Sequence, residues 1–64
     1  MQVRFEYSLG GVYKVQVAYD TEDQMLRCSN GKDFPFRNAS PRMQEAALAA
    51  KRAEIKRINQ EVIL

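Results

Sequence analysis

Five basic side chains are the residues of this chain best suited to bind a ligand. They are Arg37, Arg42, Arg52, Lys56 and Arg57. At helical spacing, Arg42, Arg52 and Lys56 project from the side of an expected C-terminal helix that lies opposite its apolar stripe. Guanidinium and ammonium groups gathered in this way attract phosphate and carboxylate groups. This surface is therefore the candidate binding site for a nucleic acid or another partner.

The same helix also carries acidic residues, which support a second interpretation of the basic surface. Glu45 lies within it, and Glu54 and Glu61 are three and four residues from Arg57. Opposite charges at these spacings attract each other on a helix. Mixed charge of this kind is typical of a solvated helix face, so anion binding and simple solvation both stay open.

Residues for catalysis, metal binding and cross-linking are scarce in this chain. It has no histidine and one cysteine, Cys28. A single thiol without histidine forms neither a zinc-ligand set nor an internal disulfide, and it lacks the usual base that activates a nucleophile. The acidic residues Asp20, Glu22 and Asp23 lack the ligand series and the glycine of an EF-hand loop. We therefore expect no catalytic residue, no metal site and no cofactor, and we predict that the protein is not an enzyme.

Length and composition predict one small domain that spans residues 1–64. A chain of 64 residues has room for a single hydrophobic core. Its net charge of +2 is too small to indicate nucleic-acid binding by itself. The first residues alternate polar and apolar side chains, unlike a signal peptide, and no apolar run approaches the roughly 18 residues that span a bilayer. We therefore expect a cytoplasmic location and no membrane contact.

The first two predicted strands cover residues 2–9 and 13–19. In each strand apolar and polar side chains alternate, as in a strand that is buried on one face. A two-residue turn at Gly10-Gly11 would place the two apolar stripes on opposite faces of the sheet. An odd connection, or a bulge, brings both stripes to one face. The pairs predicted in this way are Val3 with Tyr19, Phe5 with Val17, Tyr7 with Val15 and Leu9 with Tyr13.

A second hairpin is predicted after the acidic loop, with strands near residues 25–29 and 34–36. Asn30-Gly31 favours a type I′ turn, whose two central residues both need positive φ. A two-residue loop there would pair Met25 with Phe36 and Arg27 with Phe34, and would place Met25, Phe34 and Phe36 on one face. Pro35 confines the last strand to a sheet edge because it has no backbone donor. Residues 1–36 therefore predict an antiparallel β-meander of three to four strands.

An amphipathic helix is predicted over residues 40–63, starting at Ser40-Pro41. Serine is favourable at the N-cap and proline at the first helical position. One stripe of the helix contains Met43, Ala47, Leu48, Ile55, Ile58 and Val62, with Gln44 and Lys51 inside it. This stripe is expected to cover the sheet. The predicted fold class is α+β, a small antiparallel meander packed against one C-terminal helix in the order ββββα.

Two functional hypotheses follow from these features. The first is a non-catalytic interaction or regulatory module, because the chain is small and lacks catalytic groups. Its partner would be another protein or a second copy of the chain, reached through a sheet edge that accepts a strand or through the small side chains of Ala46, Ala49, Ala50 and Ala53. Those alanines could also reflect helix propensity alone. The second hypothesis is weak nucleic-acid binding by the basic side of the helix.

Overall fold

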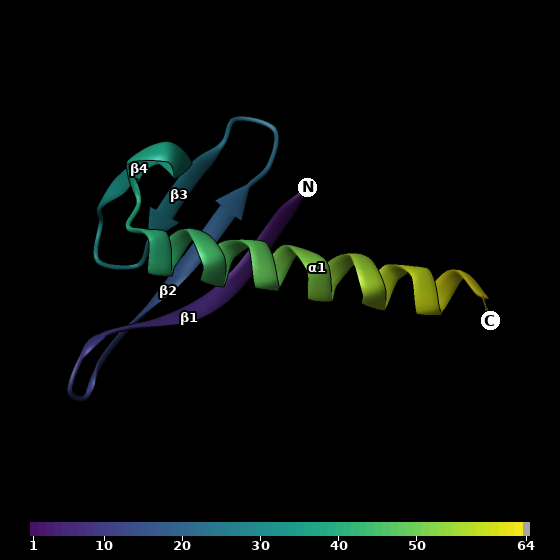
Figure 1. Ribbon diagram of the computed structural model, residues 1–64, viewed down its shortest axis with the longest axis horizontal. Coiled ribbons are helices and arrows are strands. Elements are labelled where there is room, and N and C mark those ends of the chain that lie inside the picture. The colour runs from purple at the N-terminus through teal and green to yellow at the C-terminus, as the bar shows by residue number, and fades with distance from the viewer. Residues whose placement is uncertain (64) are drawn as a thin grey trace.

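The computed structural model describes residues 1–63 and has two layers, a sheet and a helix (Figure 1). The strands β1 (Gln2–Gly10), β2 (Tyr13–Asp20), β3 (Met25–Cys28) and β4 (Asp33–Pro35) form one antiparallel sheet in the order β1-β2-β3-β4. A short 3₁₀ helix, η1 (Phe36–Asn38), leads to the helix α1 (Pro41–Ile63). The predicted α+β fold class and the ββββα order are confirmed.

The hairpin of β1 and β2 has the register that the alternating apolar residues predict. Val3 lies opposite Tyr19, Phe5 opposite Val17 and Tyr7 opposite Val15. The prediction is wrong only at the end of the hairpin, where a bulge leaves Gly10 instead of Leu9 opposite Tyr13. Gly10 and Gly11 have φ values of +132° and +56°, which residues other than glycine rarely adopt. The glycine pair therefore supplies the bulge and the turn together.

The hairpin of β3 and β4 differs from the prediction by one residue. Leu26 lies opposite Phe34, and Met25 lies opposite Pro35. The predicted pairing of Met25 with Phe36 and of Arg27 with Phe34 is therefore wrong. The odd-length loop turns Leu26, not Met25, towards the core, so Met25 does not share a face with Phe34.

The loop between β3 and β4 explains this difference. The Cys28 N–H donates to the carbonyl of Lys32, and the Gly31 N–H donates to the carbonyl of Cys28, each at 3.0 Å. Within residues 29–31 only Gly31 has a positive φ, +88°, so the type I′ turn predicted at Asn30-Gly31 does not form. Counted from the hydrogen-bonded residues Cys28 and Lys32, the loop contains three residues, not two, as in a turn that is followed by a left-handed glycine.

The start of α1 is fixed by side-chain hydrogen bonds. The Oγ of Ser40 accepts a hydrogen bond of 3.2 Å from the N–H of Met43, which confirms the predicted N-cap. Nε2 of Gln44 donates to the carbonyl oxygens of Phe36 and Ala39, both at 3.1 Å. Because Phe36 directly follows β4, these bonds hold the first turn of α1 against that end of the sheet.

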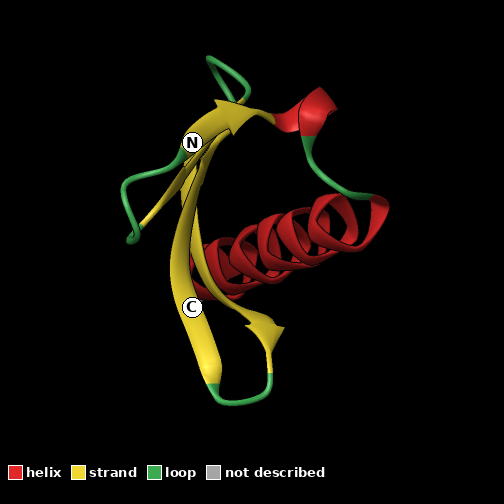
Figure 2. Ribbon diagram, turned by 90° about the vertical axis from the view of Figure 1, so that its left-hand side faces the viewer, coloured by secondary structure: helices red, strands yellow, loops and turns green. Residues whose placement is uncertain are grey.

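The hydrophobic core lies between one face of the sheet and the first half of α1 (Figure 2). Its buried residues are Val3, Val15, Val17, Tyr19, Leu26, Ala39, Met43 and Ala47. The ring of Tyr19 stacks on Phe36 with centroids 5.1 Å apart, and its hydroxyl donates to Oε1 of Gln24. The aromatic side chains near the helix thus serve packing, and one tyrosine hydroxyl has a partner at the rim.

The second half of α1 projects beyond the sheet (Figure 1). The helix residues that pack in or against the core all precede Lys51, and from Arg52 to Glu61 every residue except Glu54 is exposed. The stripe predicted to cover the sheet is therefore wrong in its second half, since Ile55 is 39% and Ile58 37% exposed. Val62, the last member of that stripe, has a side chain outside the described part of the chain.

Candidate interaction surfaces

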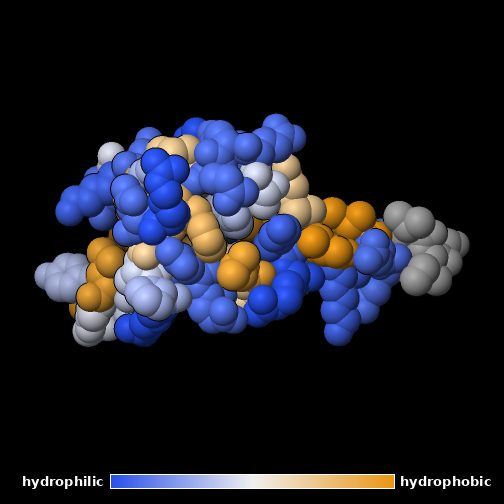
Figure 3. Space-filling view, turned by 45° about the horizontal axis from the view of Figure 1, so that its top comes forward, coloured by the Kyte–Doolittle hydropathy of each residue, from blue (hydrophilic) through white to orange (hydrophobic). Residues whose placement is uncertain are grey.

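The projecting half of α1, residues 52–61, exposes apolar side chains on a regular helix. Figure 3 shows apolar surface on the part of α1 that leaves the body of the domain. Ile55 and Ile58 are the large exposed apolar residues of this half, and Met1 is 37% exposed at the start of the chain. α1 is one continuous helix from Pro41 to Ile63, so Ile55 and Ile58 stand on the same helix that packs against the core. The domain therefore presents a preformed apolar surface.

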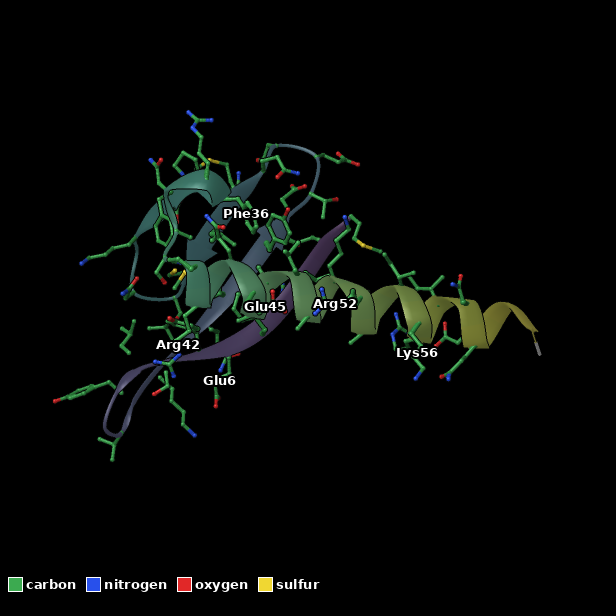
Figure 4. The ribbon with its side chains drawn as sticks, in the orientation of Figure 1. Glu6, Phe36, Arg42, Glu45, Arg52 and Lys56 are labelled. Carbon is green, nitrogen blue, oxygen red and sulfur yellow. The ribbon has the colours of Figure 1, made fainter. Side chains whose placement is uncertain are left out.

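Two of the predicted basic residues on α1 are paired with acidic residues of the same helix. Nη2 of Arg52 lies 3.0 Å from Oε1 of Glu45 (Figure 4). Arg57 lies between Glu54 and Glu61, with Nη1 at 2.6 Å from the Oε1 of Glu61. The hydrogen bond from Arg57 lowers the pKa of Glu54, so this carboxylate stays charged beside it. These ion pairs reduce the positive charge that Arg52 and Arg57 offer to a phosphate group.

The other three predicted basic residues belong to different parts of the fold. The guanidinium of Arg42 lies over the ring of Tyr7 on β1, 5.6 Å from its centroid, a cation–π contact. Arg37 belongs to η1, and Lys56 to the projecting half of α1. At 1.5 Å per residue, Arg42 and Lys56 are about 21 Å apart along the helix. The structure therefore does not gather the five predicted residues into one patch.

The face of the sheet opposite α1 carries a charged row that the sequence analysis does not identify. Arg4, Ala18 and Arg27 lie side by side across β1, β2 and β3. A shallow hollow at this row is lined by these residues and Gln16, among others. Nη2 of Arg27 is 2.6 Å from Oδ2 of Asp23, whereas within residues 1–63 no carboxylate lies within 4 Å of the Arg4 guanidinium. The pairing of β2 with β3 places Arg4 and Arg27 in one row. No clear pattern in the sequence predicts this pairing.

The remaining chemistry-bearing groups do not assemble into a site within residues 1–63. Cys28 is half-buried at the end of β3, and burial raises the pKa of its thiol. No group of three or more metal-ligating side chains is found in this part of the chain. Across the same residues, no helix has the length and the apolar character needed to cross a membrane.

Comparison of the chain with known protein families, with curated protein sequences and with solved structures gives no match. The surfaces described above therefore carry the functional argument.

Proposed function

We propose that this protein is a small non-catalytic module that binds another protein. The observation that carries the proposal is the projecting half of α1, where Ile55 and Ile58 stay exposed although the sheet is already covered by the first half of the helix. An apolar stripe on a preformed helix is a common recognition surface for protein partners. Binding would bury these side chains without a change of fold.

The chemistry of the chain supports the non-catalytic part of this proposal. The sequence contains no histidine, and its one thiol, Cys28, has a raised pKa that keeps it protonated. A half-buried, unpaired thiol is also compatible with the reducing conditions of the cytoplasm, which is the location that we propose.

Affinity capture with matched variants tests the proposed function. The double variant Ile55→Glu/Ile58→Glu places two charges on the apolar stripe, and Ala53→Glu/Gln60→Glu places the same charges on exposed positions on the other side of the helix. After nuclease treatment of a cell lysate, the wild type and the second variant should retain the same proteins, and the first variant should lose them. Equal capture by all three chains would contradict the proposal, and so would loss of capture by the Ala53→Glu/Gln60→Glu variant alone, which would place the contact on the alanine side of the helix. Circular dichroism should show that all three chains fold.

Weak nucleic-acid binding through Arg37, Arg42, Arg52, Lys56 and Arg57 is the alternative function. The ion pairs of Arg52 and Arg57 and the contact of Arg42 with Tyr7 weigh against it. A salt titration separates the two functions, because binding to phosphates weakens steeply as salt rises and an apolar protein contact does not. A mobility shift with DNA or RNA that disappears between 50 and 200 mM salt, on the order expected for several phosphate contacts, would favour the alternative.

A further inference from the structure

The two edges of the sheet differ in their protection against a further strand. β4, at one edge, has only three residues and ends with Pro35. β1, at the other edge, has nine residues and no proline. Short edge strands and prolines hinder the addition of a strand, because they leave few free backbone donors. The edge of β1 is therefore the one able to accept a strand.

The backbone groups at the free edge of β1 follow from its pairing with β2. The Thr21 N–H donates to the carbonyl of Met1 at 2.9 Å, so these two residues form a hydrogen-bonded pair of the ladder. Such pairs alternate along an antiparallel ladder, and the odd-numbered residues of β1 therefore point their N–H and C=O groups towards β2. The even-numbered residues point theirs away from the sheet. These residues are Gln2, Arg4, Glu6 and Ser8.

The helix α1 passes over the edge strand β1. α1 starts next to the end of β4, contacts β1 more than any other strand, and continues past β1 (Figure 1). A strand added to β1 would turn alternate side chains towards the face that carries Val3, Phe5 and Tyr7 and towards the open face of the sheet. The added strand would thus gain hydrogen bonds from β1 and contacts with these apolar side chains.

A second copy of the chain does not suit this place. Two β1 strands paired antiparallel over their full length are related by a two-fold axis through the middle of the pair. α1 crosses β1 near its middle, so both helices would need the same space above the paired strands (Figure 1). The occupant is therefore an extended segment of a different protein.

The open face of β1 indicates which side chain that segment carries. The Glu6 carboxylate already accepts a hydrogen bond of 3.0 Å from Nε2 of Gln16 and lies 3.5 Å from Nζ of Lys14. Arg4 has no such partner within residues 1–63. Opposite charges on directly opposed residues of neighbouring strands stabilise their pairing. An acidic residue opposite Arg4 would supply the missing charge.

We propose that the free edge of β1 binds an extended segment of a partner protein as a fifth, antiparallel strand, with apolar side chains opposite Val3, Phe5 and Tyr7 and an acidic side chain opposite Arg4. This inference rests on the proposed function and adds the chemistry of the partner segment to it.

The probe for this site is the capped peptide Thr-Val-Thr-Val-Glu-Val-Thr, used at concentrations at which it is monomeric. Paired antiparallel with residues 2–8, it places its glutamate opposite Arg4 and its valines opposite Val3, Phe5 and Tyr7. Amide exchange measured by NMR on the full chain should slow at least tenfold at Arg4 and Glu6 when the peptide is saturating. The amides of Phe5 and Tyr7, which already face β2, should change less.

Three controls test the specificity of the site. The same peptide with lysine in place of glutamate should bind the wild type at least fivefold more weakly than the glutamate peptide does. It should bind the Arg4→Glu variant more tightly than the glutamate peptide does. A peptide that is N-methylated at the amides facing β1 should not bind. The two peptide controls need no change in the protein, so they decide the question even where Arg4→Glu fails to fold.

The outcomes separate this inference from the proposed function. Protection of Arg4 and Glu6 with the expected preference for glutamate supports the strand site. Equal binding of both peptides, no binding at millimolar concentration, or shifts confined to the projecting half of α1 would overturn the strand site, and the capture result with Ile55→Glu/Ile58→Glu would still stand on its own.

Discussion

The thiol of Cys28 is held in its protonated form by its surroundings. Burial raises its pKa, and the nearby carboxylate of Asp33 acts in the same direction. The thiolate is the form that reacts with alkylating agents, so a raised pKa lowers the reactivity of the cysteine near pH 8. This residue therefore behaves as a packing residue with little tendency to act as a nucleophile.

Alkylation of Cys28 provides a test at the scale of one residue. At pH 8, we expect iodoacetamide to modify Cys28 more slowly in the folded protein than in the same chain unfolded by guanidinium, where the pKa returns to its ordinary value. Asp33→Asn should speed the reaction of the folded protein, because it removes one of the two causes of the shift. Mass spectrometry of timed samples gives both rates. A folded rate equal to the unfolded rate would contradict the assignment.

At the scale of elements, the hairpin of β3 and β4 decides which neighbouring apolar residue enters the core. Leu26 is 0% exposed and lies opposite Phe34, whereas Met25 is half-buried and lies opposite Pro35. We predict that Leu26→Ala lowers the free energy of unfolding by about 3 kcal/mol and Met25→Ala by about 1 kcal/mol, because only the first leaves a cavity in the core. Urea denaturation measures both. A larger loss of unfolding free energy for Met25→Ala than for Leu26→Ala would support the two-residue turn that the Asn30-Gly31 pair indicates.

The strands show why one register can be predicted from sequence and the other cannot. β1 and β2 each alternate along seven or more positions between side chains that face the core and side chains that face away. This pattern determines whether the loop between them has an odd or an even number of residues. β3 has four residues and begins with two apolar ones, Met25 and Leu26, either of which could face the core. Asn30-Gly31 fits a two-residue or a three-residue loop, since only the glycine needs a positive φ in the latter. The longer loop forms because it buries Leu26.

The helix shows a second limit of sequence patterns. A helix of 23 residues is about 35 Å long, whereas four strands about 4.8 Å apart span roughly 15 Å. A helix that crosses the strands therefore extends beyond the sheet, although its apolar stripe continues. The periodicity of Ile55 and Ile58 correctly predicts a helix face, but it does not tell whether that face meets the sheet or a partner.

The candidate site depends on the whole molecule and is less predictable than the fold. The basic residues of α1 can be identified from sequence, and so can the spacing of Arg57 with Glu54 and Glu61. Their separation along the helix, the contact of Arg42 with Tyr7 and the position of Arg4 beside Arg27 depend on how the elements pack. Surfaces made of several elements are therefore the part of this protein that only the structure reveals.

The core of the domain and the apolar surface of Ile55 and Ile58 are expected to reside in different parts of the molecule. The core uses residues up to Ala50, and from Arg52 to Glu61 only Glu54 is not exposed. We predict that a chain ending at Ala53 keeps its cooperative thermal unfolding, with a free energy of unfolding within about 1 kcal/mol of the full chain, because the removed residues bury little apolar surface. Calorimetry or circular dichroism measures this difference.

A substitution inside the first half of the helix serves as the matched control. Ala47 is 0% exposed against the sheet, so Ala47→Asp places a charge in the core without a partner and should abolish cooperative unfolding. The shortened chain should fold and yet fail to capture the partner that the full chain binds, since it lacks Ile55 and Ile58. If the shortened chain unfolds, the projecting half of α1 contributes to the stability of the domain, and its exposed isoleucines would no longer indicate a surface reserved for binding.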